Sequence, residues 1–148
     1  MPQSLSRILI HLVFSTKNRA RSIPPSTRSD LHAYLAGILS KLGCPPIRVG
    51  GPDDHVHLLF LLGRQQTVSQ IVENVKTSSS KWMKTRGIPG FSWQAGYGAL
   101  SIAECQVAIV DRYVQNQLEH HRKIPFQEEY RKLLTEGHVP FDERYVWD

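Results

Sequence analysis

The alternation of hydrophobic and polar residues divides the chain into short strands and longer helices. Continuous apolar runs of roughly four to eight residues are typical of buried strands, and the run from Leu58 to Leu62 is the clearest of them. Hydrophobic residues three and four positions apart indicate amphipathic helices, as between Val68 and Lys84. The pattern predicts strands at about 7–16, 45–51, 55–62 and 96–103, and helices at about 26–42, 67–86 and 104–122, followed by a tail.

The order of these elements, βαββαβ followed by a helix, is that of a ferredoxin-like α+β sandwich. In this architecture an antiparallel sheet carries helices on one face, and here a C-terminal helix carrying Tyr113 is added. We expect residues 1–148 to form a single domain with its core at about 5–125. The remaining residues, 126–148, are expected to be a C-terminal tail. Its part from Gly137 to Asp148 has more apolar surface than a free tail needs, so it is expected to dock on the core or on a partner subunit.

Two histidines precede the apolar run of the third predicted strand. Alternate residues of a strand point to the same side, so the rings of His55 and His57 can converge on one ion or one phosphate. The turn-forming cluster from Gly50 to Asp54 should place them at the rim of the sheet rather than in its centre. The pair is half of a metal site, although packing histidines are the commoner reason for such a pattern.

The predicted helix at 104–122 carries a second candidate pair. Tyr113 and Gln117 are four residues apart and therefore neighbours on one helix face. A phenol that can act as a nucleophile would lie one turn from an amide oxygen that can bind a metal, unless the two are a half-buried tyrosine and a solvated glutamine. His121 would share this face, but it is interpreted with His32, His120 and His138 as a surface residue, and His11 as a packing residue of the first strand.

The charge of the chain favours a polyanionic partner. The formal net charge is +5 and the isoelectric point is about 9.4. Basic residues with tryptophans between them could follow a nucleic-acid strand and stack on unpaired bases, although charged helix faces are usually only solvated and tryptophans are usually core. The candidate DNA-binding residues are Lys17, Arg19, Arg21, Lys76, Lys81, Lys84, Trp82 and Trp93.

Three motifs together resemble a known family. His55-Val56-His57, the aromatic segment from Phe91 to Ser101, and Tyr113 with Gln117 occur in the order and spacing of the single-tyrosine HUH (His-hydrophobe-His) transposases. These are the transposases of the smallest insertion sequences, of the IS200/IS605 type. The resemblance covers most of residues 5–125.

The resemblance implies a reaction, a cofactor and partners. Tyr113 would attack a phosphodiester of single-stranded DNA at the ends of the insertion sequence, forming a 5′-phosphotyrosine that is later rejoined. His55, His57 and the side-chain oxygen of Gln117 would bind a divalent metal ion, Mg²⁺ or Mn²⁺. The partner would be single-stranded or hairpin DNA, and the working unit would be a homodimer in which the tyrosine helix can complete the partner's site.

Three alternatives remain open at the level of sequence. A domesticated relative would use the same residues on palindromic genomic repeats, a non-catalytic module would bind single strands without cutting, and a phosphodiesterase that uses water would leave no covalent adduct. The chain has no apolar run of about 18 residues and no basic, apolar leader, so no membrane partner and a cytoplasmic location are expected.

Overall fold

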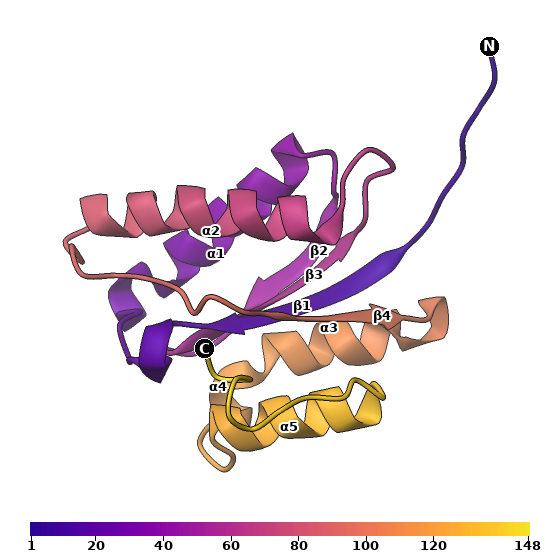
Figure 1. Cartoon of the computed structure of the whole chain (residues 1–148). Coiled ribbons are helices and arrows are strands. Elements are labelled where there is room, and N and C mark those ends of the chain that lie inside the picture. Colours follow the sequence, from indigo (N-terminus) through magenta and orange to yellow (C-terminus); the bar gives the residue numbers. More distant parts are fainter.

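The computed structural model describes residues 1–148 and contains a four-stranded antiparallel sheet with helices on both faces (Figure 1). The strands lie in the spatial order β2-β3-β1-β4. They are β1 (Leu9–Ser15), β2 (Pro46–Gly50), β3 (His55–Leu61) and β4 (Gly98–Ile102). This arrangement confirms the predicted α+β fold with an antiparallel ferredoxin-like sheet, and each strand ends within two residues of its predicted limits.

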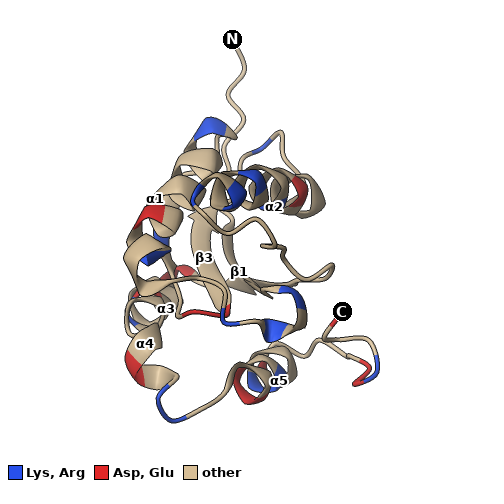
Figure 2. Ribbon diagram, turned by 90° about the vertical axis from the view of Figure 1, so that its left-hand side faces the viewer, with Lys and Arg blue, Asp and Glu red and all other residues tan.

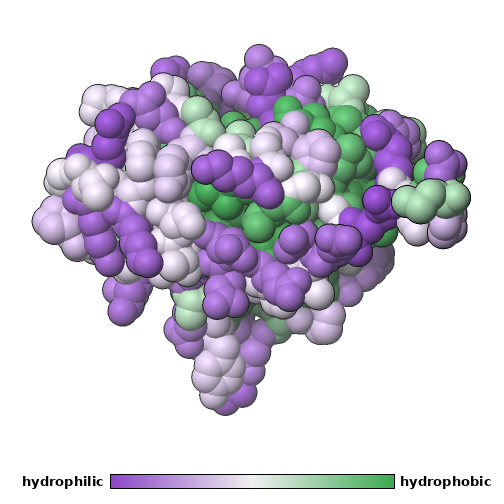
Figure 3. Space-filling view, turned by 90° about the horizontal axis from the view of Figure 1, so that it is seen from above, coloured by the Kyte–Doolittle hydropathy of each residue, from purple (hydrophilic) through white to green (hydrophobic).

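Helices α1 (Pro25–Lys41) and α2 (Val68–Thr85) cover one face of the sheet. A capping box starts α2, because the Thr67 hydroxyl accepts a hydrogen bond from the backbone N–H of Gln70 and the Gln70 side chain accepts one from the backbone N–H of Thr67. The main hydrophobic core lies between these helices and the even-numbered residues of β1 and β3. The outer surface of this layer is largely hydrophilic, with hydrophobic side chains showing near its centre (Figure 3).

The opposite face of the sheet is covered by three further helices, where the sequence predicted one. The segment predicted as a single helix at 104–122 is divided into a short 3₁₀ turn, η2 (Glu104–Gln106), followed by α3 (Val107–Gln115) and α4 (Gln117–His120). The break between α3 and α4 lies at Asn116, whose φ of −96° and ψ of 20° end the regular helix. The segment predicted as a tail contains a helix, α5 (Phe126–Glu136), so the interpretation of residues 126–136 as part of a tail was wrong.

The helix α5 has a sequence signal that the prediction overlooked. Pro125 precedes its first residue, which is a favourable helix start, and the buried residues Phe126, Tyr130 and Leu134 recur every fourth position. These three side chains pack on Val13 of β1 in a second, smaller hydrophobic cluster. None of the helices is both long and apolar enough to cross a membrane.

The even-numbered and odd-numbered residues of β1 and β3 face opposite sides of the sheet. Even-numbered residues such as Phe14 and Phe60 point into the main core, whereas Val13 points to the side of α5. His11, His55 and His57 are odd-numbered and are buried on this second side. The expectation that the histidine pair lies at a rim is therefore wrong, because α3, α4 and α5 cover the start of β3.

The last residues of the chain dock on their own chain. The Trp147 ring lies 5.9 Å from that of Tyr130, and Trp147 and Val146 pack against the smaller cluster. The backbone N–H of Gly96 donates to the carbonyl oxygen of Asp148 at 2.8 Å. Of the two expected docking surfaces, the core of the same chain is the one observed.

A close approach of backbones places α3 on the sheet. A Cβ atom on Gly50, at the end of β2, would lie 2.8 Å from the carbonyl oxygen of Val114 and 3.0 Å from its Cγ1. Only a residue without a side chain fits there, so Gly50 sets how near α3 and its Tyr113 come to β3.

We predict that Gly50→Ala lowers the free energy of unfolding by about 1–3 kcal/mol, because the new methyl group must push α3 away from β2. The matched control is Gly37→Ala in the exposed part of α1, where a Cβ meets nothing within 4 Å. That change should raise stability by about 0.5–1 kcal/mol through helix propensity. Urea unfolding curves of the two variants test the prediction, and a Gly50→Ala protein as stable as the wild type would contradict it.

Candidate active site

The two histidines of β3 form the base of a buried polar cluster. His55 and His57 are both fully buried, with ring centroids 5.1 Å apart. Antiparallel pairing sets His55 opposite Ser15 and His57 opposite Val13 of β1. The strand period thus brings both rings to the same side, as the sequence predicted.

A second residue contacts the Nδ1 atom of each of these rings at hydrogen-bond distance. The Nδ1 atom of His55 lies 2.7 Å from Oδ1 of Asp54, and Nδ1 of His57 lies 2.8 Å from Nε2 of His11. Both rings therefore direct Nε2 toward the space between β3 and the helices. His11 does more than pack in the first strand, because it fixes the orientation of the His57 ring.

The protonation states of the rings follow from their surroundings. Burial lowers the pKa of His57 to about 4 and that of His11 to about 3, so both rings are neutral at pH 7. Burial also opposes the charged form of His55, but hydrogen bonds to Asp54 and Glu129 outweigh it and raise the pKa of His55 above its ordinary value. The ring of His55 is therefore the one that carries charge most readily.

Gln117 and Tyr113 reach the same cluster. Gln117 is buried, its Oε1 lies 3.1 Å from Nε2 of His55, and its amide N–H donates to Oε2 of Glu129 at 3.1 Å. The hydroxyl of the half-buried Tyr113 donates to the same Glu129 oxygen, and its ring centroid lies 5.6 Å from that of His57. The structure thus brings all four residues predicted from the sequence together, although Tyr113 and Gln117 belong to separate helices.

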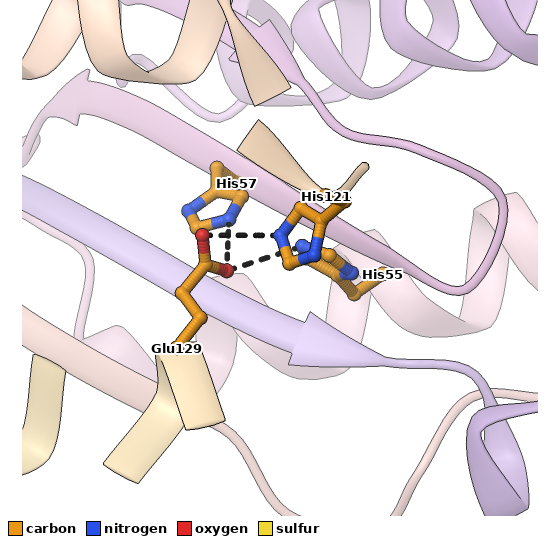
Figure 4. Close-up of side chains that lie close together, drawn as sticks. All are labelled: His55, His57, His121 and Glu129. Atoms are coloured by element: carbon orange, nitrogen blue, oxygen red, sulfur yellow. Dashed lines mark hydrogen bonds and ion pairs between the residues drawn. The ribbon is translucent and has the colours of Figure 1, made fainter. Parts of the chain in front are cut away.

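A carboxylate that the sequence analysis missed lies at the centre of the cluster. Glu129 of α5 is 3% exposed, and its Oε1 lies 3.2 Å from Nε2 of His55 and 3.1 Å from Nε2 of His57. Its Oε2 lies 3.1 Å from Nε2 of His121, and Figure 4 shows the three imidazoles around this one carboxylate. Burial raises the pKa of Glu129, but the close imidazoles of His121, His55 and His57 outweigh it and hold the pKa far below its ordinary value.

The position of His121 also corrects the sequence analysis. Its side chain is 10% exposed and points into the cluster, whereas a surface position was expected. His120 is 27% exposed and its Nε2 also lies 3.1 Å from Oε2 of Glu129. Glu129 and His121 were missed because the segment after Gln117 was not recognised as part of the second helical layer. The four-residue spacing of Phe126 and Tyr130 was the available signal.

The donor set fits a divalent metal ion. One ligand atom from each of His55, His57, His121 and Glu129 can be chosen so that all four lie within 4.8 Å of one another. Octahedral ligands about 2.1 Å from an ion are neighbours at about 3.0 Å, which is 2.1 Å times √2. The observed separations of 3.1 and 3.2 Å between imidazole nitrogens and carboxylate oxygens are close to that value. This buried group could hold a metal.

An open pocket gives access to Tyr113 from outside the cluster. It has a volume of about 620 Å³ and is bordered by the exposed Arg112 and Lys123. Asn116 and His120 also line it. Glu119 lines it as well, so the opening beside Tyr113 carries two cations and one carboxylate.

Some of the basic residues predicted to bind DNA lie near the histidines. The 3₁₀ turn η1 (Lys17–Arg19) follows β1, whose last residue pairs with His55, so Lys17, Arg19 and Arg21 lie at the His55 end of the sheet. Lys81 and Lys84 are exposed on α2, and blue segments along the ribbon of this helix mark its Lys and Arg positions (Figure 2). Trp82 is half-buried, with its ring centroid 4.8 Å from that of Tyr34.

Two of the predicted DNA contacts are structural instead. Trp93 is 7% exposed, and its indole N–H donates to the Ser79 hydroxyl at 2.9 Å, so its ring cannot stack on a base in this conformation. The ammonium group of Lys76 donates to the carbonyl oxygens of Gln94 and Gly96, at 2.7 Å in each case, and to that of Ala95 at 3.2 Å. Burial lowers the pKa of Lys76 to about 8. These positions were misinterpreted because the aromatic segment folds back onto α2.

Similar proteins share the fold and part of the sequence. The chain is 26% identical over 114 residues to the ISDra2 transposase TnpA of Deinococcus radiodurans, an alignment that spans 72% of this chain and 81% of the relative. A solved structure described as a transposase from the same organism superposes with a TM-score of 0.62 at 23% identity, covering 79% of this chain and 98% of that one. A REP-associated tyrosine transposase bound to a REP hairpin superposes with a TM-score of 0.61 at 12% identity, covering 84% and 74%.

The family itself is shown by a match to most of the chain. The model of the family described as "Transposase IS200 like" matches residues 4–117, from the segment before β1 to Gln117. That range includes His55, His57 and Tyr113, but ends before His121 and Glu129. The chain therefore belongs to the IS200-like transposase family.

Proposed function

We propose that the chain is a metal-dependent transposase that cleaves and rejoins single-stranded DNA at insertion-sequence ends through a 5′-phosphotyrosine intermediate. The observation that carries the proposal is the convergence of one phenol with two imidazoles and an amide. Tyr113 lies beside His57, and Gln117 lies beside His55, within a chain of the transposase family.

The chemistry assigns a role to each side chain. The Tyr113 oxygen would attack the phosphorus and lose its proton, the bond from phosphorus to the 3′ oxygen would break, and that oxygen would leave as a hydroxyl after taking up a proton. Rejoining reverses these steps when a 3′-hydroxyl attacks the phosphotyrosine. The energy of the broken phosphodiester bond is kept in the phosphotyrosine, so the reaction needs no ATP.

His55, His57 and the Gln117 oxygen would hold a divalent cation, Mg²⁺ or Mn²⁺, which when bound supplies Lewis-acid stabilisation of the charge on the phosphate. Asp54 and His11 would keep the two imidazoles oriented. Burial and the negative charge of Glu129 raise the pKa of Tyr113, so this hydroxyl keeps its proton until that charge is compensated.

DNA would approach along the basic end of the sheet. Lys17, Arg19 and Arg21 follow β1 near His55, and Arg112 and Lys123 border the pocket beside Tyr113. Contacts of this kind position the phosphate backbone, and binding should weaken with salt as counterions are released. The proposed ligand is single-stranded or hairpin DNA, and Lys81, Lys84 and Trp82 on α2 would extend the surface.

A second candidate is a relative that acts on palindromic genomic repeats and does not move its own gene. The neighbour bound to a REP hairpin has the same fold, which gives this candidate its support. Both functions would use Tyr113 and the histidine pair. Imperfect palindromes close to both ends of the gene would favour transposition of the element, whereas dispersed repeats elsewhere in the genome would favour the second candidate.

We predict that Tyr113→Phe abolishes the covalent adduct with a labelled single-stranded hairpin substrate in the presence of Mn²⁺, because the only proposed nucleophilic oxygen is lost. DNA binding should stay within about twofold, since the phosphate contacts lie elsewhere. Denaturing gels detect the adduct. The control is Tyr97→Phe, on a more exposed tyrosine, which should keep it. An adduct that survives in Tyr113→Phe would remove this assignment.

We predict that His57→Ala eliminates cleavage at ordinary Mg²⁺ or Mn²⁺ concentrations while binding of the hairpin is retained. The imidazole would hold the cation, whereas hairpin affinity would come from phosphate and stacking contacts. Gel-shift titrations and cleavage assays on the same preparation measure the two effects. His138→Ala, on an exposed histidine, is the control. Equal losses of binding and cleavage would indicate a purely structural role for the pair.

We further propose that the working unit is a homodimer in which α3 can complete the site of the partner subunit. Within one chain Tyr113 already lies beside its own histidines, so a composite site requires exchange of the segment that carries α3. We predict that Tyr113→Phe and His57→Ala chains, each inactive alone, regain some cleavage when co-expressed. One site of such a mixed dimer would combine intact histidines with an intact tyrosine. Confirmed mixed dimers without activity would decide for tyrosines that serve their own subunit.

A further inference from the structure

The segment after residue 117, where the family match ends, contributes side chains to the candidate active site. The match ends at Gln117, yet α5 returns to the sheet and buries Phe126, Tyr130 and Leu134 on the same side as the histidines. Glu129 lies between Phe126 and Tyr130 along the helix and is buried with them. The packing of these aromatic residues thus fixes where the carboxylate lies.

The two oxygens of this carboxylate face different parts of the site. Oε1 lies between the Nε2 atoms of His55 and His57, at 3.2 and 3.1 Å. Oε2 accepts hydrogen bonds from the Tyr113 hydroxyl and the Gln117 amide, and it lies 3.1 Å from Nε2 of both His121 and His120. One carboxylate therefore connects the atoms that would bind the cation to the atom that would attack DNA.

We propose that Glu129 and His121, both beyond the residues that the family model matches, are ligands of the active-site metal ion, and that the second oxygen of Glu129 positions the Tyr113 hydroxyl. This inference rests on the proposed function, since it concerns the same cation. It adds a negatively charged ligand and a third imidazole to a set that would otherwise consist of neutral groups from β3 and α4.

The charge partners of Glu129 are all side chains that can also bind a metal ion. All of its ion-pair partners are histidines, and no lysine or arginine pairs with it. A buried carboxylate is costly unless its charge is compensated. Each contact of 3.1–3.2 Å joins the oxygen to an imidazole nitrogen, and such nitrogens bind metals once they have lost their protons.

A carboxylate ligand also changes which ions the site should prefer. Imidazole ligands favour zinc or copper over magnesium, whereas oxygen ligands, and carboxylates above all, suit the harder ions Mg²⁺ and Mn²⁺. The negative charge of Glu129 would also compensate part of the charge of the ion within the buried cluster. Glu129 thus adds an anionic oxygen ligand to the Gln117 amide oxygen, which is the oxygen donor of this cluster within the segment matched by the family model.

The test is binding of Mn²⁺ to the full, metal-free chain without DNA, measured from the electron paramagnetic resonance signal of unbound Mn²⁺. Glu129→Gln keeps the size of the side chain and removes its charge. It should weaken Mn²⁺ binding about tenfold or more, the scale typical of changes at metal sites. The matched control is Glu128→Gln, the same change on the exposed neighbouring residue, which should leave affinity within about twofold.

A second pair of variants makes the test independent of the folding of Glu129→Gln. His121→Gln should also weaken Mn²⁺ binding about tenfold, whereas His138→Gln on an exposed residue should not. Circular dichroism and urea unfolding establish that each variant is folded. If Glu129→Gln does not fold, unchanged affinity in His121→Gln overturns the proposal.

The outcomes separate this proposal from the function on which it rests. Mn²⁺ binding that is lost in His57→Ala but retained in Glu129→Gln and His121→Gln overturns the role of α5 and leaves the proposed function standing. Unchanged binding in His57→Ala as well would remove the histidine metal site itself. Faster adduct formation by Glu129→Gln at unchanged Mn²⁺ affinity would show that the carboxylate obstructs the tyrosine, which also overturns the proposal.

Discussion

The antiparallel pairing of β1 with β3 is the constraint on which the rest of the site depends. With Val13 opposite His57 and Ser15 opposite His55, the odd-numbered residues of both strands face the same side of the sheet. A shift by one residue would turn His55 and His57 into the main core and expose Val56 and Leu58 to the helical layer on the other side. The apolar even-numbered residues prevent this shift, because they fill the core beneath α1 and α2. The hydrophobic effect thus fixes the position of the polar cluster.

The second layer converts this polar face into a closed cluster. Gly50 allows α3 to lie directly on β2, which brings Tyr113 within reach of His57, and the break at Asn116 turns Gln117 toward His55. The aromatic residues of α5 then fix Glu129 between the two imidazoles. Three segments distant in the sequence therefore meet at one carboxylate, and its burial makes their charges interact strongly.

The charges within the cluster explain why so many histidines are found in it. Imidazoles can be neutral or charged at little cost, so they can accompany a buried carboxylate in the absence of an ion and still act as ligands in its presence. His55, held by Asp54, is the ring best suited to carry a proton, whereas His57, held by His11, stays neutral. In the proposed reaction, the negative charge of Glu129 keeps the proton on the Tyr113 hydroxyl until a cation compensates that charge.

The sequence by itself determined where the four strands and the helices α1 and α2 lie along the chain, because these elements follow from apolar runs and periodicity within single segments. It also identified His55 with His57, and Tyr113 with Gln117, because each pair is set by a local spacing of two or four residues. Only the tertiary structure decided that the two pairs lie in one cluster. It also decided the burial of His11 and the structural roles of Trp93 and Lys76. Glu129 and His121 belong to this group as well. Their contacts with the strand histidines join residues more than 60 positions apart, and no local pattern records which distant segment will cover a given face of a sheet.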